Sequence, residues 1–237
     1  MSNSTKYKRI LLKLSGEALA NDKPGLYDYG FMDTVVANIK KCLDEGVQVA
    51  IVVGGGNIWR GRAGGGMDQV RADRMGMLAT VINSIAVQDA LISAGIDARV
   101  MTAVEIKGVA EPMNRDEAIR HLEAGRVVIF GGGTGSPYFT TDTTAILRAV
   151  EIKADIAFFA KNIDGVYTAD PNKDPTAKKL EEISYSQILA EKLGVIDLTA
   201  ASFGMVNKMP LLIFGLADPE NIVRGVMGEK IGTVVTL

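Results

Sequence analysis

The stretch from Val127 to Asp142 reads V-V-I-F-G-G-G-T-G-S-P-Y-F-T-T-D, a short apolar strand that breaks into glycines and then into hydroxyl side chains closed by a carboxylate. Glycines let backbone N–H groups approach an anion closely, and Thr134, Ser136 and Thr141 add hydroxyl donors. A helix that begins near Thr141 would point its positive end at the same anion. The stretch predicts a phosphate site, with an ordinary tight turn as the alternative.

Apolar runs of strand length recur along the chain, with helical patterns between them. The runs are Ile10 to Leu14, Val47 to Val53, Ala98 to Thr102, Val127 to Phe130, Ile156 to Ala160, Leu211 to Phe214 and Thr233 to Thr236. The helical patterns are Phe31 to Leu43, a stripe from Met75 that ends before Gly95, Arg115 to Glu123, Thr141 to Lys153, Ser184 to Lys192 and Asp218 to Val226. Continuously apolar strands that alternate with helices predict an α/β fold with a mostly parallel sheet covered on both faces.

The composition is that of a globular protein with an aliphatic core. The chain has 237 residues, of which 47% are apolar and only 6% are aromatic. A chain of this length can bury a large core in one domain or in two small ones. No linker or repeat stands out, so we expect a single domain over residues 1–237, with the part from about Val127 as a candidate second lobe.

The charges and the cysteine count exclude several classes of protein. The 26 basic and 28 acidic side chains leave a net charge of −2 without like-charge runs, so we expect no nucleic-acid or membrane partner. Lys13 interrupts the first apolar run too early for a signal peptide, which predicts a cytoplasmic protein. Cys42 is the single cysteine, which excludes an internal disulfide, and the single histidine, His121, is expected to be structural.

Two further strand ends combine a basic residue with glycine. The first strand ends L-K-L-S-G-E and places Lys13 where open α/β sheets bind their ligands, although such a lysine can also simply extend to the sheet edge. The second ends V-V-G-G-G-N-I-W-R-G, and Arg60 can clamp a phosphate through two N–H groups or remain a solvated loop residue. Together with the loop at Gly131, these residues favour phosphate binding.

The familiar nucleotide motifs are absent. Neither Gly54-Gly55-Gly56 nor Gly131-Gly132-Gly133 continues into G-x-G-x-x-G, because Trp59 and Ser136 occupy the final glycine position. No Gly-Lys pair exists for a Walker A loop. These absences disfavour a dinucleotide oxidoreductase and a P-loop enzyme. Three loops with Lys13, Arg60 and Asp142 suit two phosphorylated ligands that face each other, and phosphoryl transfer needs mainly positioning and charge neutralisation.

Three polar features have local interpretations. Asp73 is either a dipole-matching cap at the start of the Met75 helix or an acceptor for sugar hydroxyls. Asp218, followed by proline, predicts the N-cap of the last helix. The turn-rich sequence from Asp164 to Lys179 predicts a hairpin followed by a surface loop.

Six segments together resemble one family. They are L-L-K-L-S-G-E-A-L, V-V-G-G-G-N-x-x-R-G, M-G-M-L-A-T-V-I-N, G-T-G-S-P-Y-F-T-T-D-T, I-D-G-V-Y-T-A-D-P and G-E-K-I-G-T, and from about Lys8 to Thr236 they are similar to the bacterial UMP kinases of the amino-acid kinase superfamily. The resemblance implies transfer of the γ-phosphoryl group of ATP to UMP with Mg²⁺. It also implies a three-layer αβα sandwich around a central, mostly parallel sheet, assembled as a homohexamer. A UMP-binding lobe would span about residues 1–130 and an ATP-binding lobe about residues 131–237.

The same resemblance implies roles for individual residues. The catalytic residues would be Lys13, Arg60 and Asp142. The ATP-binding residues would be Lys13, Leu14, Ser15, Gly16, Gly56, Arg60, Asn162, Tyr167 and Asp170. The UMP-binding residues would be Gly55, Asp73 as ribose acceptor, Thr134, Gly135, Ser136, Pro137, Tyr138, Phe139, Thr140 and Thr141. Asp142 is expected to position Lys13 or the Mg²⁺-bound phosphates rather than to accept a proton, and no protein ligand is assigned to the metal.

Regulation and assembly also follow from the resemblance. Many members of the family are activated by GTP and inhibited by UTP, and Arg99 and Arg126 stand where family arginines take part in GTP binding. Gln88, Ser93 and Arg115 differ from some relatives, which weakens the expectation of GTP activation. UTP inhibition through the UMP site is the firmer expectation, and the Met75 stripe is interpreted as core, as a subunit contact, or as both.

Three other functions compete with this interpretation. Another kinase of the superfamily would act on carbamate, acetylglutamate or aspartate, and the G-T-G-S-P-Y-F-T-T-D segment argues against it. A non-catalytic regulatory subunit would keep the loops without turnover, against which the intact Lys13, Arg60 and Asp142 argue. A nicotinamide oxidoreductase is the weakest of the three. An assay of ADP release with each acceptor separates these alternatives.

Overall fold

The computed structural model describes residues 5–21, 25–60, 66–169, 171 and 173–237. Within these residues a nine-stranded sheet has the order β4-β3-β5-β2-β1-β6-β10-β11-β9. Its strands are β1 (Arg9–Leu14), β2 (Gln48–Val53), β3 (Ala98–Thr102), β4 (Glu111–Pro112), β5 (Val127–Gly131), β6 (Ile156–Lys161), β9 (Glu182–Ser184), β10 (Leu211–Gly215) and β11 (Thr233–Thr236). Each pair of neighbours is parallel except β10 with β11. The predicted mostly parallel sheet is confirmed.

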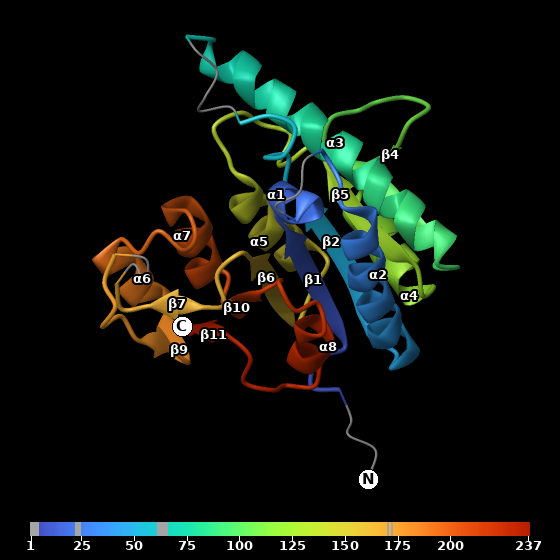
Figure 1. Cartoon of the computed structure of the whole chain (residues 1–237). Coiled ribbons are helices and arrows are strands. Elements are labelled where there is room, and N and C mark those ends of the chain that lie inside the picture. The colour runs from blue at the N-terminus through green and yellow to red at the C-terminus, as the bar shows by residue number, and fades with distance from the viewer. Residues whose placement is uncertain (1–4, 22–24, 61–65, 170, 172) are drawn as a thin grey trace.

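The helices lie between the strands along the chain. They are α1 (Gly16–Ala20), α2 (Tyr29–Asp44), α3 (Gln69–Ser93), α4 (Arg115–Glu123), α5 (Thr141–Glu151), α6 (Tyr185–Glu191), α7 (Leu198–Val206) and α8 (Asn221–Val226). The six predicted helices are all present, whereas the short α1 and α7 were not predicted. The longest, α3, runs along one flank of the molecule (Figure 1).

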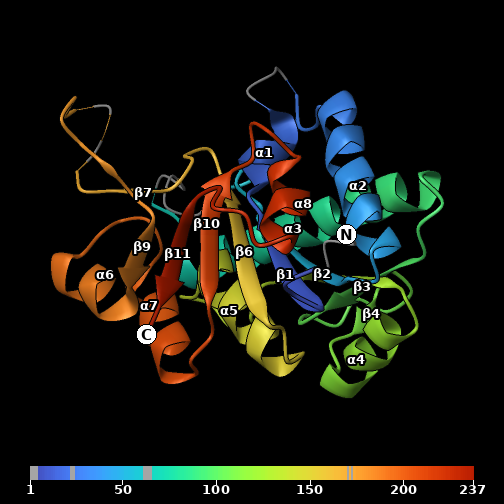
Figure 2. The same cartoon turned by 90° about the horizontal axis from the view of Figure 1, so that it is seen from below.

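Two buried clusters cover the two faces of the sheet and give three layers. One cluster joins alternate strand residues to α2, α3 and α8, and the other joins the remaining strand residues to α4, α5, α6 and α7. Seen from below, α2 and α8 lie on one side of the strands and α4 and α5 on the other (Figure 2). The three-layer αβα sandwich is therefore confirmed.

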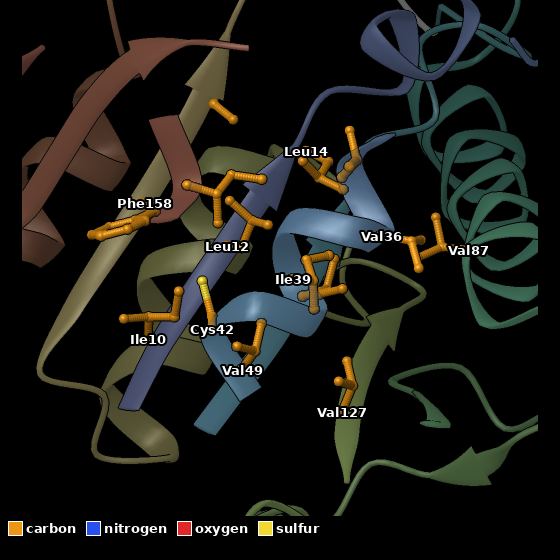
Figure 3. Close-up of a cluster of buried hydrophobic side chains, with 14 of the residues drawn as sticks. Ile10, Leu12, Leu14, Val36, Ile39, Cys42, Val49, Val87, Val127 and Phe158 are labelled. Atoms are coloured by element: carbon orange, nitrogen blue, oxygen red, sulfur yellow. The ribbon is translucent and has the colours of Figure 1, made fainter. Parts of the chain in front are cut away.

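The alternation of side chains along β1 decides where its lysine points. Ile10, Leu12 and Leu14 face α2, where they pack near Ile39 and Cys42 (Figure 3). Leu11 belongs to the cluster on the opposite face. Because strand side chains alternate between faces, Lys13 shares the face of Leu11 and lies on the side of α5.

The order of the strands separates the two halves of the sequence. Strands that precede residue 132 form the part β4-β3-β5-β2-β1, and those that follow form β6-β10-β11-β9. Within the sheet, the two halves meet at the parallel pairing of β1 with β6, and α5 of the second half also packs on β1 and β2 of the first. The assignment of the halves as separate UMP-binding and ATP-binding lobes stays a prediction.

Local capping predictions were wrong at two helix starts. The last helix begins at Asn221 rather than at Asp218, because Asn221 and Ile222 donate to the carbonyls of Asp218 and Pro219 in a tight preceding turn. The long helix begins at Gln69 with Asp68 as its N-cap, which leaves Asp73 beyond the first turn and excludes the capping interpretation of Asp73.

The hairpin after Asp164 is present in a different form from the one predicted. Val166–Tyr167 (β7) pairs antiparallel with Lys179–Leu180 (β8), so a long loop separates the two short strands. Asp164 and Gly165 precede β7 instead of forming the turn.

One helix among the described residues, α3, is long and apolar enough to cross a membrane by length and composition alone. Its apolar side chains fall on two sides. Ala79, Val87 and Leu91 are buried, whereas a stripe of large apolar side chains is exposed. The stripe consists of Met75, Leu78, Ile82, Ile85 and Ile92.

Candidate active site

Two cavities adjoin at the carboxyl ends of the parallel strands, the edge at which open α/β sheets bind ligands. The first has a volume of about 390 Å³ and the second about 130 Å³. The first is lined by Lys13, Ser15, Gly16, Glu17, Gly54, Gly55, Gly56, Thr141, Asp142, Lys161, Asn162, Ile163, Gly194 and Val195. The second is lined by Gly55, Gly56, Trp59, Ala72, Asp73, Gly76, Met77, Thr80, Gly133, Thr134, Ser136, Phe139, Thr140 and Thr141. The two cavities share Gly55, Gly56 and Thr141.

A carboxylate between two lysines forms the floor of the first cavity. Asp142 lies in the first turn of α5, which begins here because the Thr140 hydroxyl caps its free N–H groups. Nζ of Lys13 is 3.0 Å from Oδ1 of Asp142, and Nζ of Lys161 is 3.1 Å from Oδ2. Lys161 also donates to the carbonyl of Val195. Three charges from β1, β6 and α5 thus meet where the two neighbouring strands end.

The pKa values of this cluster follow from burial and from the neighbouring charges. Burial opposes ionisation of Asp142, but Lys13 and Lys161 outweigh it and hold the pKa of the carboxyl below its ordinary value. Burial lowers the pKa of Lys161, an effect that Asp142 opposes and Lys13 reinforces. The cluster carries net positive charge when both lysines are protonated, and it can bind an anion without the carboxylate acting as a base.

The loop after β1 passes directly against the glycine loop after β2. A Cβ atom on Gly16 would lie 2.5 Å from Oδ1 of Asn57 and 2.7 Å from the carbonyl oxygen of Gly54. Only glycine allows this contact of main chain with main chain. Ser15 precedes it and caps α1 by accepting a hydrogen bond from the N–H of Ala18. The first cavity therefore has two backbone loops on one wall.

The second cavity is formed by α3 and by the loop after β5. Oδ2 of Asp73 accepts a hydrogen bond of 2.7 Å from the backbone N–H of Tyr138, which ties that loop to α3. Oγ1 of Thr80 accepts a 2.8 Å hydrogen bond from the N–H of Gly132. Thr140, at the other end of the loop, donates to Asp197. The loop is therefore held at three points while its hydroxyls border the cavity.

Most of the predicted site residues line one of the two cavities, but several do not. Leu14 is buried in the core, and Gly135, Pro137 and Tyr138 belong to the loop without lining the second cavity. Hydroxyl Oη of Tyr167 donates to Asp164 at 2.7 Å, outside both linings. Asp170 lies outside the described residues.

The predicted arginines are paired with carboxylates. Arg60 lies beside the cavities with 65% of its side chain exposed, and it forms a 2.5 Å ion pair with Glu17. Arg99 and Arg126 both pair with Asp97, at 2.8 Å for Nε of Arg126. Arg99 is the second residue of β3, and Arg126 immediately precedes β5. Both therefore lie at the amino ends of these strands, at the opposite edge of the sheet from the two cavities.

Sequence reasoning missed several residues of the site. Lys161 is the last residue of the otherwise apolar strand I-A-F-F-A-K. A lysine at the carboxyl end of an apolar strand is the same signal that identified Lys13 in the sequence. Gly194 and Val195 come from a loop without a motif, and Thr80 comes from the middle of a helix. No local chemistry identifies Gly194 or Val195, because only the fold brings them to the cavity, whereas Thr80 lies in the segment M-G-M-L-A-T-V-I-N, which contributed to the family resemblance without a role assigned to the threonine.

The chain has a three-layer α/β fold and two adjoining cavities, one of which contains the cluster of Lys13, Asp142 and Lys161. These features define an enzyme of the phosphotransferase class. The chain belongs to the amino acid kinase family, whose model matches residues 8–215.

Three solved structures closely resemble the chain. A UMP kinase from Bacillus anthracis has a TM-score of 0.94 and 37% identity, with 97% of this chain and 96% of that chain covered. A UMP kinase from Ureaplasma parvum has a TM-score of 0.92 and 34% identity, with 98% and 100% covered. A uridylate kinase from Archaeoglobus fulgidus has a TM-score of 0.75 and 32% identity, with 96% and 99% covered. The predicted resemblance to UMP kinases is confirmed over almost the whole chain.

Proposed function

We propose that this protein transfers the γ-phosphoryl group of ATP to the α-phosphate of UMP, giving ADP and UDP for pyrimidine nucleotide synthesis. One observation carries the proposal beyond the resemblance to solved UMP kinases. Gly55, Gly56 and Thr141 line both cavities, so two ligands placed in them would meet end to end. Direct transfer between two nucleotides requires such an arrangement.

The larger cavity suits ATP and the smaller suits UMP. Lys13 and Lys161 in the larger cavity supply charge for phosphate oxygens, and Asn162 lies farther along the same wall. Asp73 and the hydroxyls of Thr134 and Thr140 supply hydrogen-bonding groups in the smaller one. A ribose hydroxyl would donate to Asp73, whose carboxylate is already oriented by the backbone of Tyr138.

The chemistry requires charge stabilisation rather than a protein base. An anionic oxygen of the UMP α-phosphate attacks the γ-phosphorus, the bond to the β,γ-bridging oxygen breaks, and ADP leaves with that electron pair. No proton has to be removed from the attacking oxygen. Asp142, whose pKa is held below its ordinary value, serves by fixing Lys13 and Lys161.

Magnesium enters this reaction as part of the substrate. Among the described residues, no group of three or more His, Cys, Asp or Glu side chains could hold a metal ion. Both oxygens of Asp142 are already engaged by lysines. These residues fit an Mg²⁺ ion that arrives bound to the phosphates of ATP and would neutralise part of their charge there.

A coupled assay of ADP release tests the activity. Purified protein with Mg-ATP should turn over UMP far faster than CMP, dUMP, carbamate, acetylglutamate or aspartate. A comparable rate on one of the last three acceptors would reassign the chain to another activity of the superfamily. No turnover with any of these acceptors, together with measurable binding of ATP, would favour a non-catalytic regulatory subunit.

Assembly and regulation form part of the same proposal. The exposed stripe on α3 is an apolar surface suited to contact with further copies of the chain, in support of a homohexamer in the cytoplasm. UTP, which shares its base and ribose with UMP, would inhibit by occupying the smaller cavity. GTP would have to displace Asp97 from Arg99 and Arg126 in order to use them.

A further inference from the structure

We infer that Asn83 of α3 is a positioning residue for phosphoryl transfer, because it fixes the glycine loop that separates the two cavities. The inference rests on the proposed function, since it assigns to Asn83 the task of holding Gly55 and Gly56 in register with two nucleotides. Asn83 itself lines neither cavity. It acts through the loop.

The amide of Asn83 is fully buried and fully used. Nδ2 donates to the carbonyl of Gly54 at 2.6 Å and to Oδ1 of Asn57 at 2.7 Å. Oδ1 accepts from the hydroxyl of Tyr27 at 2.9 Å and from Nδ2 of Asn57 at 3.3 Å. The side chain is 0% exposed. An amide has two N–H donors and two acceptor lone pairs, so every hydrogen-bonding position of Asn83 is occupied.

These bonds hold the two ends of a loop whose middle touches both cavities. Gly54 and Asn57 bracket Gly55 and Gly56, the two glycines that both linings share. The loop also has no room to move toward the helix. A Cβ atom on Gly55 would lie 3.0 Å from the Cβ of Ala79 and 3.0 Å from the carbonyl oxygen of Gly76.

The same face of α3 also holds the other glycine loop. Thr80, one turn before Asn83, accepts the hydrogen bond from Gly132 after β5. One turn of helix therefore sets the position of the loop after β2 relative to the loop after β5. A misplacement of about 1 Å costs about 100-fold in the rate of a reaction that depends on alignment, so loss of this turn's hydrogen bonds should affect turnover beyond any effect on folding.

The Asn83→Asp variant tests the inference because it keeps the size of the side chain and removes both amide N–H donors, leaving at most one O–H donor when the carboxyl is protonated. We expect kcat per folded molecule to fall about 100-fold for UMP and ATP together. The Tyr27→Phe variant, which removes only one of the four hydrogen bonds, should lower kcat several-fold. The Asn38→Ala variant is the matched control, because Asn38 is also a buried helical asparagine and its Nδ2 donates within its own helix to Thr34.

A second measurement does not depend on turnover. Trp59, the single tryptophan of the chain, donates its backbone N–H to Gly55 at 2.9 Å and its indole N–H to the carbonyl of Ala72 at 2.9 Å. Its fluorescence therefore reports the position of the loop. We expect a shifted emission maximum and greater acrylamide quenching in folded Asn83→Asp, with no change in Asn38→Ala. If Asn83→Asp does not fold, Asn83→Ser, which keeps one donor, replaces it with the same expectations.

The outcomes separate this inference from the proposed function. A wild-type protein that does not phosphorylate UMP would end the proposed function, while the tryptophan signal would still test the loop contact. A folded Asn83 variant with wild-type kcat and wild-type fluorescence would overturn the inference even if UMP turnover is normal. Equal losses of kcat in the Asn83 and Asn38 variants would also overturn it, since both would then be effects on stability alone.

Discussion

The ammonium of Lys161 lies 3.1 Å from Oδ2 of Asp142, while Lys13 occupies Oδ1 of the same carboxylate at 3.0 Å. The two lysines are 148 residues apart in sequence, but they come from adjacent strands, and α5 places the carboxylate between them. Two ammonium groups on either side of a buried carboxylate form a cluster with net positive charge, because the carboxylate offsets their mutual repulsion without neutralising both.

Replacement of Lys161 by methionine should lower kcat for UMP phosphorylation about 100-fold, because a charge that stabilises the transferred group is lost. The variant should still fold. Lys107→Met, at an exposed lysine that lines neither cavity, is the control and should keep wild-type kcat. Steady-state kinetics in which both variants match the wild type would show that Lys161 has only a structural role.

The Asp142→Asn substitution should destabilise the fold by about 3 kcal/mol or more, because it leaves two largely buried lysines without their partner. The folded pKa of Asp142 is lowered, so its stabilising contribution is present above the ordinary value of 3.8 and is lost as the pH falls through the lower folded value. Urea unfolding should therefore give a constant difference from wild type between about pH 5 and pH 7 and a smaller one at about pH 3. A difference that grows on acidification would contradict the assignment.

Arg60→Ala should reduce turnover by orders of magnitude and leave stability within about 0.5 kcal/mol of wild type. Its side chain is mostly exposed, so its pairing with Glu17 stabilises the fold little. Its partner Glu17 lines the first cavity and its neighbour Trp59 lines the second, which places the guanidinium beside the expected phosphates. Turnover and thermal unfolding are measured on the same preparation. Near-normal turnover would leave Arg60 as a loop residue without a catalytic role.

Ile82→Glu should shift the protein to a smaller assembly in size-exclusion chromatography with light scattering. Ile82 is 50% exposed in the middle of the apolar stripe of α3, and a buried carboxylate there would oppose association. Val206→Glu is the matched control, because Val206 is an exposed apolar residue of α7, outside the stripe. An unchanged mass for Ile82→Glu would place the subunit contact elsewhere.

Cys42 should resist thiol reagents in the native protein and react quickly in denaturant. It is 1% exposed on the face of α2 that packs against the sheet, and burial raises its pKa to about 12, so little thiolate exists at pH 8. Because it is the single cysteine, the rate of labelling reports opening of this core. Rapid labelling of folded protein at pH 8 would contradict the packing of α2 on the sheet.

Much of the framework follows from local patterns. Seven apolar runs became strands of the sheet, and the glycine-rich segments follow β2 and β5 as expected. Such signals can be read from the sequence because the alternation of strands with helices and the need to bury apolar faces act over short stretches of chain. The two wrong helix starts, at Asp73 and Asp218, show the limit of local rules, since competing caps and turns a few residues away decided them.

The sequence by itself determined that Lys13 and two glycine loops stand at strand ends and that Asp142 stands near the start of a helix, because strand, turn and helix signals fix these positions locally. Only the tertiary structure decided which of them meet. The parallel pairing of β1 with β6 brings Lys161 near Lys13, with Asp142 of α5 between them. The packing of α3 places Asn83 against the loop after β2. These contacts join residues distant along the chain, and their energies depend on burial and geometry that no local pattern encodes.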